Sequence, residues 1–143
     1  MLSNIKRVGG SSAGAIVALI LSLNYSQSKL SKILSNLNLL DFKDESFGPI
    51  GDIVRLTNEF GWYKGDKFKE WIEDIIEEKT GNKHSTFKDI NEQKEEYNFK
   101  DLYILGTNLS THFTEIFSYE HTPNMKISEA VRISMSIPLF LNL

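Results

Sequence analysis

The chain has 143 residues, a net charge of -3 and an isoelectric point near 5.6, with 41% hydrophobic and 11% aromatic residues. This composition argues against disorder and predicts one domain, residues 1–143, with a buried core. The acidic balance argues against nucleic acid as a partner, and the absence of cysteine excludes disulfides and thiolate metal sites.

The first predicted elements are a strand ending at residues 5–8 and a buried apolar helix over residues 13–23. Between them lies the pattern Gly-x-Ser-x-Gly, formed by Gly10, Ser11, Ser12, Ala13 and Gly14. At a strand-to-helix junction this pattern predicts a nucleophile elbow, with Ser12 held in a cramped turn. Gly10 and Gly14 are then expected to be small because the backbone segments pass closely. Ser12 is the candidate nucleophile, and the N–H of Ala13 is the candidate oxyanion donor at the helix N-terminus.

Three other interpretations fit parts of this segment. A flexible turn would have the same Gly-Ser composition. A phosphate-binding loop also needs Gly and Ser before a helix, but the required Lys does not follow. A signal peptide would use Lys6 and Arg7 as its charged part, but glycines and serines interrupt the join and residues 24–27 offer no convincing cleavage site. The apolar run is also shorter than the roughly 20 residues that span a bilayer.

The middle of the chain predicts further helices. Apolar residues recur at helical spacing over residues 30–37 after Ser28, which is the expected N-cap. Residues 41–51 predict a surface loop, and residues 53–61 predict a short helix.

The clearest helix is predicted to open at Gly65 and Asp66, with Asp66 as N-cap, and to end at Gly81. It has apolar residues on one face and charged residues on the other. Thr86 and Asp89 have the spacing of a capping box and predict one more helical turn.

The last part of the chain predicts a strand pair and a helix. Polar residues 91–100 predict a loop, whereas residues 102–105 and 113–119 predict two strands. Ser128 is expected to cap a helix that continues over residues 130–135. Because strands and helices alternate along the chain, the predicted fold class is α/β, with helices covering a sheet.

Five segments together resemble the patatin-like phospholipase family, in the order that the family has them. They are residues 10–15, 61–72, 86–90, 105–111 and 130–140. The first resembles the family's Gly-x-Ser-Ala-Gly-Ala nucleophile motif, and the last matches its Ala-Val-Arg-x-Ser-x-Ser-Ile-Pro segment closely. Departures from the pattern include Ser11, which stands where Thr or Gly is common, and Asn108, which stands where Asp is frequent.

The resemblance implies a three-layer α/β fold, incomplete at both ends, and lipid acyl hydrolysis by a Ser-Asp dyad with Ser12 as the nucleophile. The family's aspartate belongs to an Asp-Gly motif just after the region of residues 130–140, and no Asp-Gly dipeptide occurs in this sequence. The family's Gly-rich oxyanion loop, which precedes the elbow, is also absent upstream of Val8. We therefore expect the 143-residue chain alone to have little activity.

Two other hypotheses remain open. An esterase with a Ser-His-Asp triad would need Ser12, then Asp101, then His112 or His121, an order that the sequence satisfies formally. These histidines and His84 lie in polar contexts, where solvated side chains are common. The other hypothesis is a non-catalytic remnant or interaction module.

The family resemblance also implies partners. The expected substrate is a phospholipid or another acyl lipid, with transient contact to a membrane surface. Three scattered histidines and no carboxylate cluster predict no metal, and no cofactor is expected. The expected location is cytoplasmic, or secreted without a recognisable signal peptide.

Overall fold

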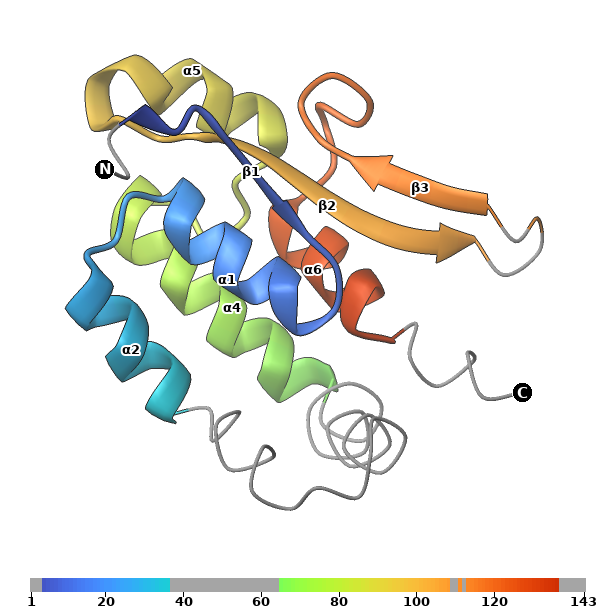
Figure 1. The fold of residues 1–143 in the computed structure, drawn as a ribbon, viewed down its shortest axis with the longest axis horizontal. Helices are drawn as coiled ribbons and strands as arrows, with labels where there is room; N and C mark the ends of the chain where they lie inside the picture. The colour runs from blue at the N-terminus through green and yellow to red at the C-terminus, as the bar shows by residue number, and fades with distance from the viewer. Residues whose placement is uncertain (1–3, 37–64, 109–110, 112, 137–143) are drawn as a thin grey trace.

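The computed structural model describes residues 4–36, 65–108, 111 and 113–136. Its elements, labelled in Figure 1, are β1 (Arg7–Gly10), α1 (Ala13–Ser22), α2 (Gln27–Asn36), α4 (Gly65–Thr80), α5 (Phe87–Tyr97), β2 (Asp101–Asn108), β3 (Phe113–Phe117) and α6 (Ile127–Ser136). The prediction of an α/β fold with helices covering a sheet is confirmed. The loop predicted at residues 41–51 and the short helix at residues 53–61 lie outside the described residues.

The described strands form one mixed sheet in the order β1-β2-β3. β1 and β2 are parallel, with Gly10 opposite Ile104, and β3 returns antiparallel to β2, with Ile116 opposite Leu105. Parallel strands need a long crossover, which here carries α1, α2, α4 and α5. The carboxyl ends of β1 and β2 consequently lie at the same edge of the sheet, and α1 begins at that edge.

One face of the sheet carries the core. Leu102, Ile104 and Phe117 are buried on that face, and α1 and α6 pack against β2 and against each other. Figure 1 shows α1, α4 and α6 on the same side of the sheet. The fully buried side chains include Ile16, Leu19 and Ile20 of α1 with its C-cap Leu23, Ile72 and Ile76 of α4, and Ile127 and Val131 of α6. α1 is buried along most of its length because nearly all its side chains are apolar.

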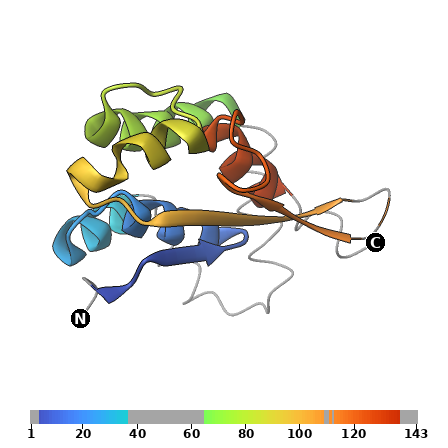
Figure 2. The same ribbon diagram turned by 90° about the horizontal axis from the view of Figure 1, so that it is seen from above.

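The β2–β3 hairpin extends past the helices, as both views show (Figures 1 and 2). Four of the five residues of β3 are exposed, and the side chain of Phe113 is 73% exposed. The predicted second strand is shorter than expected, because a tight turn begins after Phe117. In that turn the N–H of Thr122 donates to the carbonyl oxygen of Ser118 at 2.7 Å.

Residues 91–100 are not the predicted loop. α5 continues to Tyr97 and ends where Asn98 adopts a left-handed conformation with φ of 58°. The capping box of Thr86 and Asp89 is confirmed, since each side chain accepts a hydrogen bond from the backbone N–H of the other residue. The polarity of residues 91–100 suggested a loop. It was misleading, because Phe87 and Ile90 are the buried residues of α5 and nearly all of its other residues are polar.

Three predicted N-caps are also corrected. α2 begins two residues earlier than an N-cap at Ser28 would place it, and Ser26, not Ser28, accepts the N–H of Lys29 at 3.2 Å. Asp66 and Ser128 lie inside the first turns of α4 and α6 and do not precede them. The predicted end of α4 is confirmed, because Gly81 has a φ of 81° and its N–H donates to the carbonyl oxygen of Glu77.

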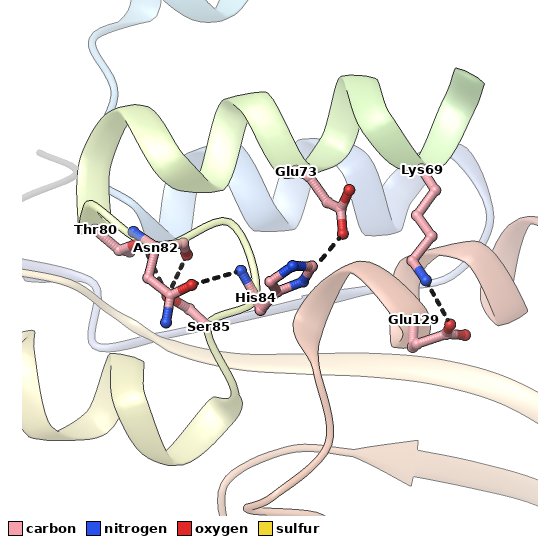
Figure 3. Close-up of polar contacts among 7 residues, drawn as sticks. All are labelled: Lys69, Glu73, Thr80, Asn82, His84, Ser85 and Glu129. Atoms are coloured by element: carbon pink, nitrogen blue, oxygen red, sulfur yellow. Dashed lines mark hydrogen bonds and ion pairs between the residues drawn. The ribbon is translucent and has the colours of Figure 1, made fainter. Parts of the chain in front are cut away.

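Polar contacts fix α4 to its neighbours (Figure 3). The Nζ of Lys69 on α4 donates to Oε1 of Glu129 on α6 at 2.9 Å, and this bond holds the pKa of the Glu129 carboxyl below its ordinary value of 4.5. One turn further along α4, Glu73 lies 3.4 Å from Nδ1 of His84 in the following loop. α6 is thus attached to α4 by charge as well as by packing. Among the described residues, no helix is long and apolar enough to cross a membrane.

Candidate active site

The turn between β1 and α1 holds Ser12 in an unusual backbone conformation. Its φ is 53° and its ψ is -129°, and it immediately precedes the first residue of α1. A non-glycine residue in such a conformation costs about 1–3 kcal/mol and is found where the surrounding structure enforces it. The turn closes through the N–H of Gly14, which donates to the carbonyl oxygen of Ser11 at 2.9 Å. The predicted tight turn is therefore present at Ser12.

Gly10 has no room for a side chain. A Cβ atom at this position would lie 2.3 Å from the carbonyl oxygen of Gly14 and 2.5 Å from its carbonyl carbon, both of which are backbone atoms. The expectation that Gly10 must be small is therefore correct. The same expectation for Gly14 is not supported, because a Cβ there meets no described atom within 4 Å. The close approach involves the backbone of Gly14, which any residue would supply.

Ser134 on α6 connects this turn to the sheet. The N–H of Ser12 donates to the Oγ of Ser134 at 2.9 Å, and that hydroxyl donates to the carbonyl oxygen of Leu105 on β2 at 2.8 Å. Ser134 is 1% exposed. Sequence reasoning did not single out Ser134. The available signal was a serine on an otherwise apolar helix face, beside Ala130, Val131 and Met135.

The reactive groups of the elbow are left unpaired by the described residues. The Ser12 side chain is half-buried and makes no capping hydrogen bond to α1. The N–H of Ala13, the predicted oxyanion donor, has no acceptor in the described part of the chain. It belongs to the first turn of α1, where N–H groups lack intrahelical partners and the helix dipole favours negative charge. A hydroxyl and a free N–H therefore lie next to each other at the start of a buried helix.

The structure does not assemble the Ser-His-Asp triad that the sequence allows. Asp101 begins β2 opposite Arg7, and Ile104 lies opposite Gly10, so Asp101 is about 10 Å along the strand from the level of the elbow. Its carboxylate accepts a bond from the Nζ of Lys94 at 3.1 Å. His121 lies in the turn after β3, where its Nδ1 is 2.9 Å from the Oγ of Ser118.

Among the described residues, no other candidate base contacts Ser12. His84 pairs with Glu73 on α4, and His112 lies outside the described residues. Asp89 is used in the capping box of α5, and Asp74 is exposed on α4. No described carboxylate or imidazole is hydrogen-bonded to Ser12.

Two cavities that the described residues form lie away from Ser12. One is lined by Phe87, Tyr103 and Glu120 between α5 and β2, and another by Lys6, Asn24 and Lys100 at the amino ends of β1 and β2. A cleft beside Ser12 stays a prediction. Within the described ranges, no three His, Cys, Asp or Glu side chains gather where they could hold a metal ion.

Comparisons of the sequence with known proteins identify a family and several relatives. A family model described as patatin-like phospholipase matches residues 1–142. An uncharacterized protein of Acanthamoeba polyphaga mimivirus is 38% identical over 140 residues, which are 97% of this chain and 43% of the viral protein. The uncharacterized protein YqhO of Bacillus subtilis is 31% identical over 94% of this chain and 46% of its own length.

The name of a third relative states a function. A probable lipid hydrolase of invertebrate iridescent virus 6 is 27% identical over 96% of this chain and 45% of the viral protein. The chain thus spans less than half the length of each of these relatives. No solved structure shows significant similarity to it.

Proposed function

Since the chain belongs to the patatin-like phospholipase family, we propose that it carries the nucleophile of a lipid acyl hydrolase and that Ser12 is that nucleophile. The observation that carries the proposal is the conformation of Ser12, with φ of 53° and ψ of -129° between a strand and a buried helix. Strain of this kind concentrates at catalytic residues. The close packing of Gly10 on the backbone of Gly14 gives a second reason, because it explains the first glycine of the Gly-x-Ser-x-Gly pattern.

The proposed reaction is acyl transfer through a covalent intermediate. The Oγ of Ser12 attacks the carbonyl carbon of an ester, and its proton passes to a base. The N–H of Ala13 and the N-terminus of α1 stabilise the negative charge that develops on the carbonyl oxygen. The ester C–O bond then breaks, and the alcohol leaves with the proton. Water subsequently attacks the acyl-serine, which releases the fatty acid and restores the hydroxyl of Ser12.

The base is the part of the mechanism that the described residues do not supply. The family resemblance indicates an aspartate in an Asp-Gly motif, and this sequence contains no such motif. The Ser-Asp dyad and the phospholipid substrate are therefore proposals about the protein at its natural length. The name of the iridescent virus relative, a probable lipid hydrolase, is consistent with the substrate class.

Covalent labelling tests the nucleophile directly. The protein at its natural length is incubated with a fluorophosphonate probe and then assayed on phospholipid vesicles and short-chain p-nitrophenyl esters. We expect labelling and turnover that Ser12→Ala reduces to background, since loss of the nucleophile removes a factor on the order of 10⁶ in comparable enzymes. Ser11→Ala is the matched control, because it removes the neighbouring hydroxyl and leaves the nucleophile.

Two results would contradict the proposal. Labelling that persists in Ser12→Ala would assign the nucleophile to another residue. A folded protein of natural length that neither labels nor turns over any ester would favour a non-catalytic interaction module.

A further inference from the structure

The hydroxyl of Ser134 makes two hydrogen bonds whose directions are fixed by chemistry. The N–H of Ser12 can only donate, and the carbonyl oxygen of Leu105 can only accept. The single proton of the Ser134 hydroxyl must therefore point to Leu105, at 2.8 Å, while a lone pair accepts the N–H of Ser12, at 2.9 Å. One buried side chain thus satisfies one backbone group on each of two other elements.

The hydrogen bond between Ser134 and the N–H of Ser12 acts on the strained residue itself. Three bonds, N–Cα, Cα–Cβ and Cβ–Oγ, separate the hydrogen-bonded nitrogen of Ser12 from its reactive oxygen. A rotation that released the unfavourable φ of 53° would break the bond to Ser134 and would move the hydroxyl of Ser12. The bond therefore opposes relaxation of the turn.

The position of Ser134 adds a second constraint. α6 packs against β2 and α1, and its first turn is attached to α4 through the hydrogen bond between Glu129 and Lys69. Because Ser134 is 1% exposed among apolar neighbours, water is excluded from replacing its hydroxyl. The packing of α6 on β2, together with the two hydrogen bonds of Ser134, thereby constrains where α1 begins.

We propose that Ser134 is a positioning residue for the nucleophile, and that its hydroxyl locks the backbone of Ser12 in the reactive conformation of the elbow. The inference rests on the proposed function insofar as Ser12 is the nucleophile. Ser134 touches no reacting atom. It acts on the orientation of Ser12, and its loss should lower kcat and leave KM nearly unchanged.

Two other serines provide matched controls. Ser128 lies on the same helix and is also 1% exposed, but its Oγ has no hydrogen-bond partner among the described residues. Ser22 is fully buried at the opposite end of α1, where its Oγ donates to the carbonyl oxygen of Lys100 at 2.7 Å. Ser128→Ala controls for removing a buried hydroxyl from α6, and Ser22→Ala controls for losing a buried hydrogen bond far from the elbow.

The first measurement requires no activity. Amide hydrogen exchange of Ser12, followed by NMR in the purified chain, reports directly on the bond to Ser134. We expect the Ser12 N–H to be protected in the wild type, Ser128→Ala and Ser22→Ala, and to exchange at least about tenfold faster in Ser134→Ala. Ser134→Thr keeps the hydroxyl and should restore protection. Equal exchange in Ser134→Ala and the wild type, both folded, would overturn the inference.

The second measurement uses the protein at its natural length. The rate of fluorophosphonate labelling and kcat should fall about 10- to 100-fold in Ser134→Ala, as expected for a nucleophile displaced by a fraction of an ångström. Both should be unchanged in the folded Ser128→Ala and Ser22→Ala variants. Equal labelling rates in Ser134→Ala and the wild type would reject the positioning role. If the wild type itself never labels at Ser12, the proposed function fails, and the exchange measurement alone decides whether Ser134 locks the elbow.

Discussion

At the carboxyl end of β1 the residue with positive φ is a serine, Ser12, whereas near the amino ends of β1 and β2 such residues are asparagines, Asn24 and Asn98. At the carboxyl end, Ser12 has positive φ with a ψ of -129°, Gly10 packs on backbone atoms, and a single hydroxyl joins three elements. At the amino end, Lys94 pairs with Asp101 near solvent. A serine hydroxyl makes a hydrogen bond to the backbone at each end of α1, Ser134 at the elbow and Ser22 at the other end. Of the two, only the bond of Ser134 holds a residue in a costly conformation.

The left-handed residues sharpen this contrast. Asn98 ends α5 with φ of 58° and ψ of 38°, a conformation that asparagine tolerates well in helix C-caps. Serine at φ of 53° and ψ of -129° has no such preference. The comparison of Ser12 with Asn98 shows that a positive φ by itself does not mark a functional residue. The residue type and the full pair of angles distinguish a helix end from an elbow.

Among the variants that test this comparison, Gly10→Ala is expected to change the free energy of unfolding the most. Gly10→Ala places a methyl group 2.3 Å from the carbonyl oxygen of Gly14, so that the turn must open. We expect a loss of about 3 kcal/mol or more in the free energy of unfolding, measured by urea denaturation. Gly14→Ala is the control and should change stability by less than about 1 kcal/mol, because its Cβ meets no described atom. Similar losses in both variants would show that the close approach does not constrain the turn.

A smaller effect is expected from relieving the strain at Ser12. Ser12→Gly should be more stable than Ser12→Ala by about 1 kcal/mol, since glycine avoids about 1–3 kcal/mol of strain but loses about 0.5–1 kcal/mol through its more flexible unfolded state. Both variants lack the hydroxyl, so the difference isolates the backbone. Thermal unfolding measures it as a shift of about 3–5 °C. Asn98→Gly should remain within about 0.5 kcal/mol of the wild type. If glycine gave no advantage over alanine at position 12, the strain would not exist in solution.

The smallest effect concerns the attachment of α6 to α4. Because the pKa of Glu129 is lowered mainly by its bond with Lys69, the pair stabilises the fold above about pH 4.5, and this contribution is lost as the pH falls through the lowered pKa. Lys69→Met should therefore reduce stability at pH 7, by less than about 1 kcal/mol because both side chains are partly exposed. The deficit should shrink in acid. Lys83→Met, a change at an exposed lysine, is the control, and a deficit of Lys69→Met that did not depend on pH would contradict the assignment.

Local patterns predicted much of this fold. The Gly-x-Ser-x-Gly pattern between a strand and an apolar run predicted the turn at Ser12, and the capping-box spacing predicted the start of α5 at Thr86. Both features depend on residues close together in the sequence. The end of α5 was missed because a helix with few buried residues has no strong apolar period, and only the conformation of Asn98 ends it.

The candidate site was predicted less completely, because part of it is tertiary. Ser12 and Ala13 follow from the motif, and their catalytic roles stay predictions. Ser134 is 122 residues away from Ser12, and no local pattern indicates which backbone N–H its hydroxyl accepts. The order of residues in the chain also allowed a triad with Asp101, whereas the strand register places that residue at the other end of β2.

The long sequence separation between Ser12 and Ser134 has a consequence for biosynthesis. The ribosome makes Ser12 122 residues before Ser134, so the helix that holds the backbone of Ser12 is completed only long after the serine itself. Contacts between such distant residues form late and slowly in folding, because a long loop must close first. A nascent chain therefore carries the serine well before it has the elbow, and we expect the reactivity of Ser12 to appear only after α6 has been made and has packed.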